Sequence, residues 1–385
     1  MNLLDRYAAQ LDDLKQQGNL RQFTSHTQQG RSINIGGHQM LNLASNDYLG
    51  LAANVQLREQ FFDETPNHLR VMSSSSSRLL TGNFPEYEQL EASLSQAFAG
   101  RAALLFNSGY HMNIGILPAL SDAKTLILAD KLVHASMIDG IRLSAAKYVR
   151  YRHNDLAHLE QLLKKYHSDE SFDRIIVVTE SIFSMDGDET DLAALVRIKQ
   201  QFAKVMLYVD EAHAIGVRGE HGLGCAEQYN VIEEIDLLVG TFGKALASVG
   251  GYLICHSILR DYLINSMRPL IFSTAQPPIC MAWSNFIFQK VLDLNTQRQH
   301  LHAMSQYLQQ ALRSKSFACP SSSQIVPVII GESAKTVAKA QQLQQAGFYI
   351  MPVRPPTVPK HSSRLRICLS TQITQSDLDQ LLPLL

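Results

Sequence analysis

A lysine and an aspartate, each placed just after an apolar run, are the residues of this sequence best suited to chemistry. Lys244 ends the segment DLLVGTFGK at 236–244, and Asp210 follows the apolar run 205–209 and precedes His213. This layout fits a pyridoxal 5′-phosphate (PLP) site, in which the lysine forms a Schiff base and the aspartate keeps the pyridine nitrogen protonated. Taken singly, these residues are also typical of a solvated loop lysine and of an aspartate that caps a helix.

Three further segments could take part in such a site. Residues 107–113 follow an apolar run and open a helical pattern, so backbone N–H groups beside Gly109 could bind a phosphate, with a tight turn as the alternative. Residues 179–188 (TESIFSMDGD) place acidic and hydroxyl groups where parallel strands bind ligands. Their Asp-Gly-Asp could also be a turn or a weak cation loop, although it is too short for an EF-hand. His134 lies near a helix start, where a histidine usually caps the helix or packs in the core. The alternative is that its ring lies over the cofactor.

The elements that would position these residues alternate between helical and strand patterns from residue 85 to about 275. Apolar runs predict buried strands at 102–106, 125–129, 175–179, 205–209 and 237–239, and helices are predicted at 85–98 and 134–143. Continuous apolar strands separated by helices indicate a mostly parallel sheet covered on both faces. The sequence therefore predicts an α/β fold.

The two ends of the chain have a different pattern. Helices are predicted at 2–17, 291–314, 335–346 and at the C-terminus, strands at 327–330, 348–350 and 364–369, and a hairpin around Gly36-Gly37. We expect an N-terminal helix and arm at 1–45, a large domain at 46–285 and a small α+β domain at 286–385. The serine run 73–77 has the composition of a linker, but its apolar and helical flanks favour an ordered loop.

Composition restricts the class of protein. The 385 residues are 45% hydrophobic and 18% charged, which is ordinary for a globular protein with a sizeable core. A net charge of −1 argues against a nucleic-acid partner and gives no reason to expect a membrane surface. No apolar run could span a membrane, and the N-terminus does not resemble a signal peptide. The five dispersed cysteines form no metal-like cluster, so we expect a cytoplasmic protein with reduced thiols and no metal.

Four motifs together resemble the α-oxoamine synthases, which are fold type I PLP-dependent transferases that condense an amino acid with an acyl thioester and release carbon dioxide. The motifs are TFGK at 241–244, DEAH at 210–213, ESIFSMDGD at 180–188 and SNDYLG at 45–50. The resemblance runs from about residue 20 to the end. It implies a large domain with a mostly parallel sheet of the seven-stranded type and a small C-terminal α+β domain.

Within this family, one group of enzymes is the most similar. The sequences RPPTVP at 354–359 and RLR at 364–366 resemble enzymes that join L-alanine to a pimeloyl thioester, and HND at 153–155 is also similar to them. The thiol carrier, coenzyme A or acyl carrier protein, stays open. Two other hypotheses are another synthase such as glycine C-acetyltransferase, and a non-catalytic PLP-binding regulatory module. Such modules are usually fused to DNA-binding segments, and no basic helix-turn-helix stretch precedes residue 40.

The resemblance implies a role for each candidate residue. Lys244 would hold the cofactor and move protons, Asp210 would pair with the pyridinium nitrogen, and His134 would stack on the ring. The other implied cofactor contacts are Gly109, Tyr110 and Thr241 at the phosphate, His213 at the ring hydroxyl, and Glu180 and Ser184 nearby. Ser273 and Thr274 would reach the phosphate of a neighbouring subunit, which implies a homodimer with shared sites. The implied substrate contacts are Arg366 and Asn46 at the amino acid carboxylate, His134, and Arg21 and Thr357 at the acyl group.

Two positions depart from the family pattern. Residues 73–77 are serines where the family usually has glycine-rich sequence, and Tyr87 stands where it usually has a histidine. Both positions concern a loop or acyl-side contacts. Neither affects the expected role of Lys244.

Overall fold

The computed structural model describes residues 3–385, which divide into two compact units. Unit 1 is formed by Met1–Ala53, Met185–Asp188 and Gln299–Leu385, and unit 2 by Asn54–Ser184 and Glu189–Arg298. The N-terminal arm shares a unit with the C-terminal segment because β3 (His38–Asn42) pairs in parallel with β12 (Phe348–Tyr349). The domain boundaries expected at 45/46 and 285/286 stay predictions.

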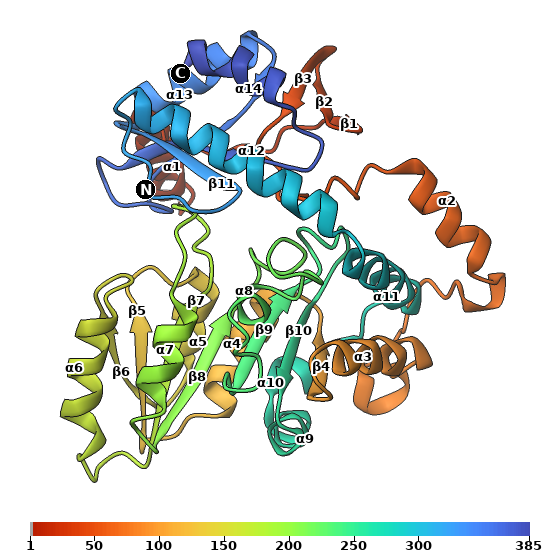
Figure 1. The fold of residues 1–385 in the computed structure, drawn as a ribbon, viewed down its shortest axis with the longest axis vertical. Coiled ribbons are helices and arrows are strands. Elements are labelled where there is room, and N and C mark those ends of the chain that lie inside the picture. The colour runs from red at the N-terminus through yellow and green to blue at the C-terminus, as the bar shows by residue number, and fades with distance from the viewer. Residues whose placement is uncertain (1–2) are drawn as a thin grey trace. The chain divides into compact units, whose positions relative to one another are not determined.

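Unit 2 is built on a mostly parallel seven-stranded sheet, as the sequence predicts (Figure 1). In spatial order the strands are β4 (Ala102–Phe106), β10 (Gly251–Cys255), β9 (Leu237–Thr241), β8 (Val205–Asp210), β7 (Arg174–Glu180), β5 (Thr125–Asp130) and β6 (Lys147–Tyr151). In this sheet β10 is antiparallel to both of its neighbours, β4 and β9, and the other pairs of strands are parallel. The strands β5, β9 and β10 are buried at every position, which explains their continuous apolar sequence.

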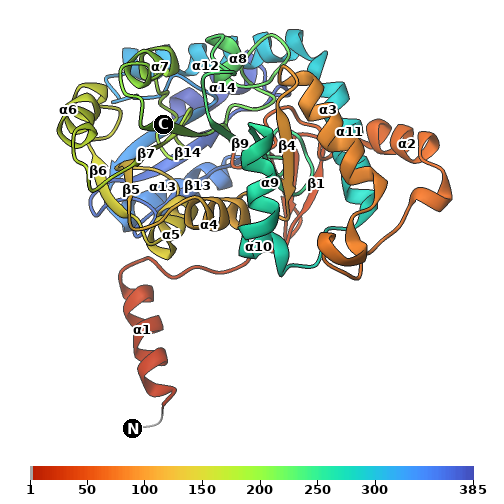
Figure 2. The same cartoon turned by 90° about the horizontal axis from the view of Figure 1, so that it is seen from below.

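Helices cover both faces of this sheet, with α4 and α5 on one side and α7 on the other (Figure 2). The helices of unit 2 are α2 (Val55–Glu64), α3 (Pro85–Ala97), α4 (Gly109–Ala119), α5 (Ala135–Leu143), α6 (Leu156–His167), α7 (Leu192–Lys199), α8 (Cys225–Gln228), α9 (Ser257–Ser266), α10 (Arg268–Ile271) and α11 (Pro278–Leu292), with short turns at Asn67–Leu69 and Arg78–Gly82. Within residues 3–385 no helix is both long and apolar enough to cross a membrane.

Unit 1 contains two small sheets. The first has the order β1 (Thr27–Gln29), β2 (Ser32–Ile35), β3, β12, and the second has the order β11 (Ile325–Gly331), β14 (Ser363–Cys368), β13 (Met351–Val353). Its helices are α1 (Asp5–Gln16), α13 (Ser333–Gln345), α14 (Gln375–Leu381), the short turn Leu382–Leu384 and most of α12 (Asn295–Ser314). The hairpin expected around Gly36-Gly37 is confirmed by the pairing of β2 with β3.

The helix predicted at 291–314 is wrong at its start, because the chain breaks there into α11 and α12. The N–H groups of Asp293 and Leu294 bond to carbonyls three residues back, so the α-helical ladder ends at this point. Asn295, which then begins α12, belongs to the residues that favour helix ends over helix interiors.

Replacing Gly187 by alanine should destabilise unit 1. Gly187 has φ +68°, and a Cβ atom there would lie 2.0 Å from the carbonyl oxygen of Ile325. Gly36 is a matched control, because it has φ +59° but nothing within 4 Å of the added atom. Both substitutions should cost about 1–2 kcal/mol of backbone strain, and only Gly187→Ala adds a steric clash.

We therefore expect scanning calorimetry to show a melting temperature for Gly187→Ala that is lower than that of Gly36→Ala by roughly 4 °C or more. Equal losses in the two variants would contradict the clash with Ile325.

Candidate active site

The candidate cofactor residues of unit 2 gather at the carboxyl edge of its sheet. β7 ends at Glu180, β8 at Asp210 and β9 at Thr241, and the register pairs Glu180 with Asp210. The carboxyl ends of parallel strands are where open α/β sheets bind their ligands. Strand register alone therefore brings three of the sequence-predicted residues to one place.

Asp210 is held in a fixed orientation at this edge. Its side chain is 6% exposed, and its Oδ1 accepts the backbone N–H of Ala212 at 2.8 Å. Its Oδ2 accepts a hydrogen bond from the amide of Asn113 at 3.1 Å. A carboxylate buried to this degree needs such donors, because burying an unpaired charge is costly.

Lys244 lies in the turn after β9, beside His213. Its Nζ is 2.8 Å from Nε2 of His213, which is itself buried. The turn is closed by the N–H of Ala247, which donates to the Lys244 carbonyl. The amine and the imidazole, 31 residues apart in sequence, thus share one site.

His134 caps a helix, which is one of the interpretations that the sequence leaves open, and its stacking on a cofactor stays a prediction. It caps α5, with Nδ1 accepting from the N–H of Ser136 at 3.3 Å and lying 2.7 Å from the Ser136 hydroxyl. Burial lowers the pKa of His134, Asp210 opposes this shift, and Lys244 adds to it. The imidazole is therefore kept mainly neutral, which suits a ring that stacks on a cofactor.

Glu180 is a buried acid at the same edge. Its side chain is 3% exposed, and within residues 3–385 its Oε1 has no hydrogen-bond partner. Burial raises the pKa of Glu180 well above its usual value, and the neighbouring charge of Asp210 raises it further. Burial thereby favours the neutral form of Glu180, and a neutral carboxyl group can donate a hydrogen bond to a ligand.

The start of α4 offers backbone N–H donors to an anion. Gly109 is the first residue of α4, so the N–H groups of its first turn have no partner within the helix. A Cβ added at Gly109 would lie 3.8 Å from Cβ of Thr241, which places these two residues side by side. A Cβ at Gly251 would lie 3.1 Å from the Gly109 nitrogen, so the absence of a side chain at Gly251 leaves the backbone N–H of Gly109 uncrowded. Tyr110 is half exposed, and its hydroxyl donates to Asp139.

The remaining cofactor candidates also lie in unit 2. Ser184 is half-buried in the segment that follows β7. The carbonyl of Thr274 accepts a hydrogen bond from Asn107 at 2.8 Å, which brings the 273–274 segment close to the start of α4 in the same chain. Whether the hydroxyls of Ser273 and Thr274 serve a second copy stays a prediction.

Apart from His134, which lies in unit 2, the candidate substrate residues lie in unit 1 and form two pairs. Arg366, on β14, is 9% exposed, and its Nη1 donates to Oδ1 of Asn46 at 3.0 Å and to Sγ of Cys368 at 2.8 Å. The hydroxyl of Tyr48 also donates to Asn46 and lies 3.5 Å from Nη2 of Arg366. In the second pair, Nη2 of Arg21 donates to Oγ1 of Thr357 at 2.9 Å.

Arg364 and Arg366 are both buried, so neither is a surface charge. Arg364 is 5% exposed and forms a close ion pair with Asp186. Asp186 therefore belongs to a turn that holds an arginine, and within residues 3–385 no cluster suited to a metal ion was found. The two arginines of β14 have different partners despite sharing one face of the strand.

The serine run 73–77 and Tyr87, which depart from the family pattern, lie in an ordered part of unit 2. The hydroxyl of Ser74 donates to the Gln276 carbonyl at 2.6 Å, and the Ser76 carbonyl accepts the N–H of Ala275. Tyr87 is buried, and its hydroxyl accepts the N–H of Gln276 at 2.7 Å. The serine run is thus a structured loop, as its flanks indicate.

One buried site residue, Asn113, was not singled out from the sequence. It lies in α4 one turn after Gly109, and its amide contacts Asp210, Ser136 and Tyr208. The sequence feature that could have indicated Asn113 is a polar amide in an otherwise apolar helix, one turn after the predicted phosphate-binding residues. This feature does not predict which residues Asn113 contacts.

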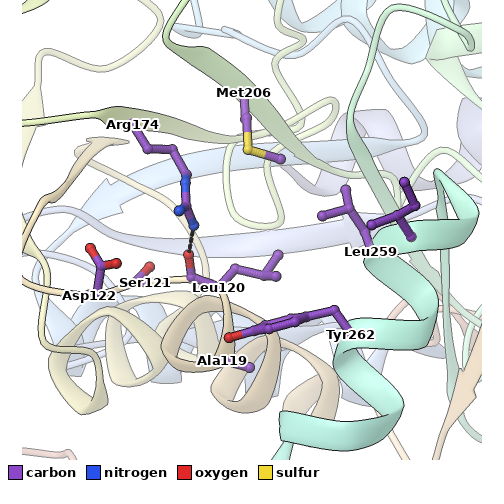
Figure 3. Close-up of a pocket in the computed structure, with 9 residues that line it drawn as sticks. Ala119, Leu120, Ser121, Asp122, Arg174, Met206, Leu259 and Tyr262 are labelled. Carbon is purple, nitrogen blue, oxygen red and sulfur yellow. Dashed lines mark hydrogen bonds between the residues drawn. The ribbon is translucent and has the colours of Figure 1, made fainter.

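A separate pocket of about 340 Å³ lies at the opposite ends of the same strands (Figure 3). Arg174 begins β7 and Met206 is near the start of β8, and both line this pocket with Tyr262 of α9. Arg174 donates to the carbonyl of Leu120. The pocket is therefore distinct from the edge that carries Asp210.

Comparison with known proteins decides the family. The model of the family described as aminotransferase class I and II matches residues 38–385. The chain belongs to this family. It is 57% identical to a Pasteurella multocida protein named "Putative 8-amino-7-oxononanoate synthase", over 97% of this chain and 96% of that one. A Neisseria gonorrhoeae protein of the same name is 53% identical over 97% of this chain and 98% of that one.

Solved structures show the same fold. A Sphingomonas wittichii serine palmitoyltransferase matches with a TM-score of 0.88 and 28% identity, over 100% of this chain and 97% of that one. An 8-amino-7-oxononanoate synthase from Francisella tularensis matches with a TM-score of 0.75 and 26% identity, over 90% and 96%. The expected fold type I architecture, the resemblance to the α-oxoamine synthases and PLP as the cofactor are confirmed by this family.

Proposed function

We propose that this chain is an acyltransferase that joins L-alanine to a pimeloyl thioester and releases carbon dioxide and the free thiol. The product is 8-amino-7-oxononanoate, a precursor in biotin biosynthesis. The observation that carries the proposal is the gathering of Lys244, His213 and Asp210 at one sheet edge. The names of the relatives at 53–57% identity support the choice of substrates.

The cofactor half of the reaction rests on residues of unit 2. When bound, PLP supplies an electron sink for the bond that is broken at the amino acid Cα. Asp210 would keep the pyridine nitrogen protonated, and His134 would stack on the ring as a neutral imidazole. Lys244 takes the proton from Cα at Nζ and returns it after carbon dioxide has left. The first turn of α4, with Thr241, holds the phosphate.

The substrate half rests on residues of unit 1. Arg366 binds the alanine carboxylate through two parallel N–H groups, which orients the Cα–H bond. Asn46 supports that guanidinium through its Oδ1. Arg21 and Thr357, already joined by a hydrogen bond, contact the acyl chain. The overall reaction forms one bond from Cα to the thioester carbonyl carbon and breaks two others. The electron pair of the C–S bond leaves with the thiolate, and the electron pair of the bond from Cα to the carboxylate stays at Cα, where it takes up the returned proton.

The first test is turnover of defined substrate pairs by the purified protein. With L-alanine and pimeloyl-CoA, mass spectrometry should detect the keto-amine, and Lys244→Ala should abolish it because no base remains at Cα. Borohydride reduction followed by peptide mapping should place the pyridoxyl label on Lys244. A label on Lys204, or no product from any pair, would contradict the assignment.

Glycine with acetyl-CoA and serine with palmitoyl-CoA are the matched comparisons for this assay. The structural likeness to serine palmitoyltransferase makes the second pair informative. Preference for either pair over alanine with pimeloyl-CoA would replace the proposed substrates and keep the reaction type. Comparing pimeloyl-CoA with pimeloyl acyl carrier protein identifies the thiol carrier.

Exchanging the two arginines of β14 for lysine separates substrate binding from stability. Arg366→Lys keeps the charge but loses the bidentate geometry, so the KM for alanine should rise strongly and kcat should fall, with PLP content unchanged. Arg364→Lys weakens a buried pair with Asp186, so it should lower the melting temperature while the KM for alanine stays near the wild-type value. The opposite ranking in alanine titrations would assign the carboxylate site to Arg364.

We also propose a cytoplasmic homodimer with shared sites. None of the five cysteines forms a disulfide bond within residues 3–385, and this supports a reducing compartment. Mixing Lys244→Ala with Thr274→Glu tests the sharing, because a mixed dimer would have both defects in one site and neither in the other.

After subunit exchange, about a quarter of wild-type activity should return, since half of the dimers are mixed and each has one intact site. Exchange shown by mass without any recovery would rule out a contribution of Thr274 across the interface.

A further inference from the structure

Asn113 joins two groups that contact different parts of the cofactor in the proposed mechanism. Its Nδ2 donates to Oδ2 of Asp210 at 3.1 Å and to Oγ of Ser136 at 3.0 Å. Ser136 in turn lies 2.7 Å from Nδ1 of His134. A single amide therefore connects the partner of the pyridine nitrogen with the stacking imidazole.

The orientation of this amide follows from the chemistry of its neighbours. The carboxylate of Asp210 can only accept hydrogen bonds, so the amide nitrogen must face it. The hydroxyl of Tyr208 donates to Oδ1 of Asn113 at 2.6 Å and fixes the other end. Both hydrogens of the amide group and its oxygen are then used.

Because Asn113 and its partners are buried, the amide needs all of its hydrogen bonds within the protein. Asn113 is 2% exposed, and Tyr208 and Ser136 are 0% and 1% exposed. A buried amide is costly unless its donors and acceptors are paired. An apolar residue in this helix position would avoid that cost, so packing alone gives no reason for an asparagine here.

We propose that Asn113 is a positioning residue that sets the Asp210 carboxylate against the pyridine nitrogen and the His134 ring against the cofactor face. Its action passes through Asp210 directly and through Ser136 to His134. The inference rests on the proposed cofactor role of these residues. It does not depend on which acyl group the enzyme uses.

Titration of apoprotein with PLP tests this role without any turnover. Asn113→Ala should raise the dissociation constant for PLP by roughly 10–100-fold, the range found for groups that orient the ligands of a bound metal ion. The visible circular dichroism of bound PLP should weaken, because the ring is less firmly oriented. The pH dependence of its visible absorbance should also change, because Asp210 is less well aligned with the nitrogen.

Two further variants separate positioning from simple stability. Tyr208→Phe keeps the amide and its contact with Asp210 but removes the donor to Oδ1, so it should weaken PLP binding less than Asn113→Ala. Gln309→Ala removes a different buried amide, in unit 1, whose Nε2 donates to the Ser323 carbonyl at 2.9 Å. It should lower the melting temperature of the apoprotein and leave PLP affinity and the visible spectrum unchanged.

The outcomes distinguish this inference from the proposed function. Failure of the wild-type protein to bind PLP would overturn both. Wild-type binding, with Asn113→Ala unchanged in affinity, dichroism and pH dependence, would overturn the positioning role alone. If Asn113→Ala does not fold, Tyr208→Phe decides: an intermediate loss of affinity with altered dichroism supports the role, and wild-type values overturn it.

Discussion

The need to satisfy buried charge at the end of a parallel sheet is the constraint on which the candidate site depends. Asp210 lies at the end of β8 and is almost fully buried, so the chain must supply N–H donors from Ala212 and Asn113. The same register places Glu180 beside it, and the pKa of Glu180 rises because burial and the Asp210 charge both oppose its ionisation. The charged form of Glu180 is thereby disfavoured at this edge.

Much of this edge can be predicted from the sequence, because strand ends leave a clear local pattern. Apolar runs that stop at Glu180, Asp210 and Thr241 mark the ends of β7, β8 and β9 within a residue or two. A right-handed α/β arrangement then brings those ends together. The contact between Lys244 and His213 follows from the same logic, since each closely follows such a strand.

Contacts between distant segments leave no comparable pattern. The sequence does not indicate that β3 pairs with β12, some 300 residues later, which is why the N-terminal arm shares a unit with the C-terminal segment. Alternation on β14 places Arg364 and Arg366 on one face but cannot assign Asp186 to the first and Asn46 to the second. The partners of Asn113 could not be predicted for the same reason, because Ser136, Asp210 and Tyr208 all lie outside α4.

The turn that carries Lys244 adds a further physical requirement. Ala247 in this turn has φ +46°, a left-handed conformation that costs an alanine about 1–2 kcal/mol. It is held there because the indole N–H of Trp283 donates to its carbonyl at 3.0 Å and the N–H of Ser248 donates to the Phe242 carbonyl. Strain of this kind persists only where the surroundings determine the backbone conformation, and it tends to occur at functional sites. The backbone of Lys244 is therefore fixed, and in the proposed mechanism Nζ would move protons by rotation of the side chain alone.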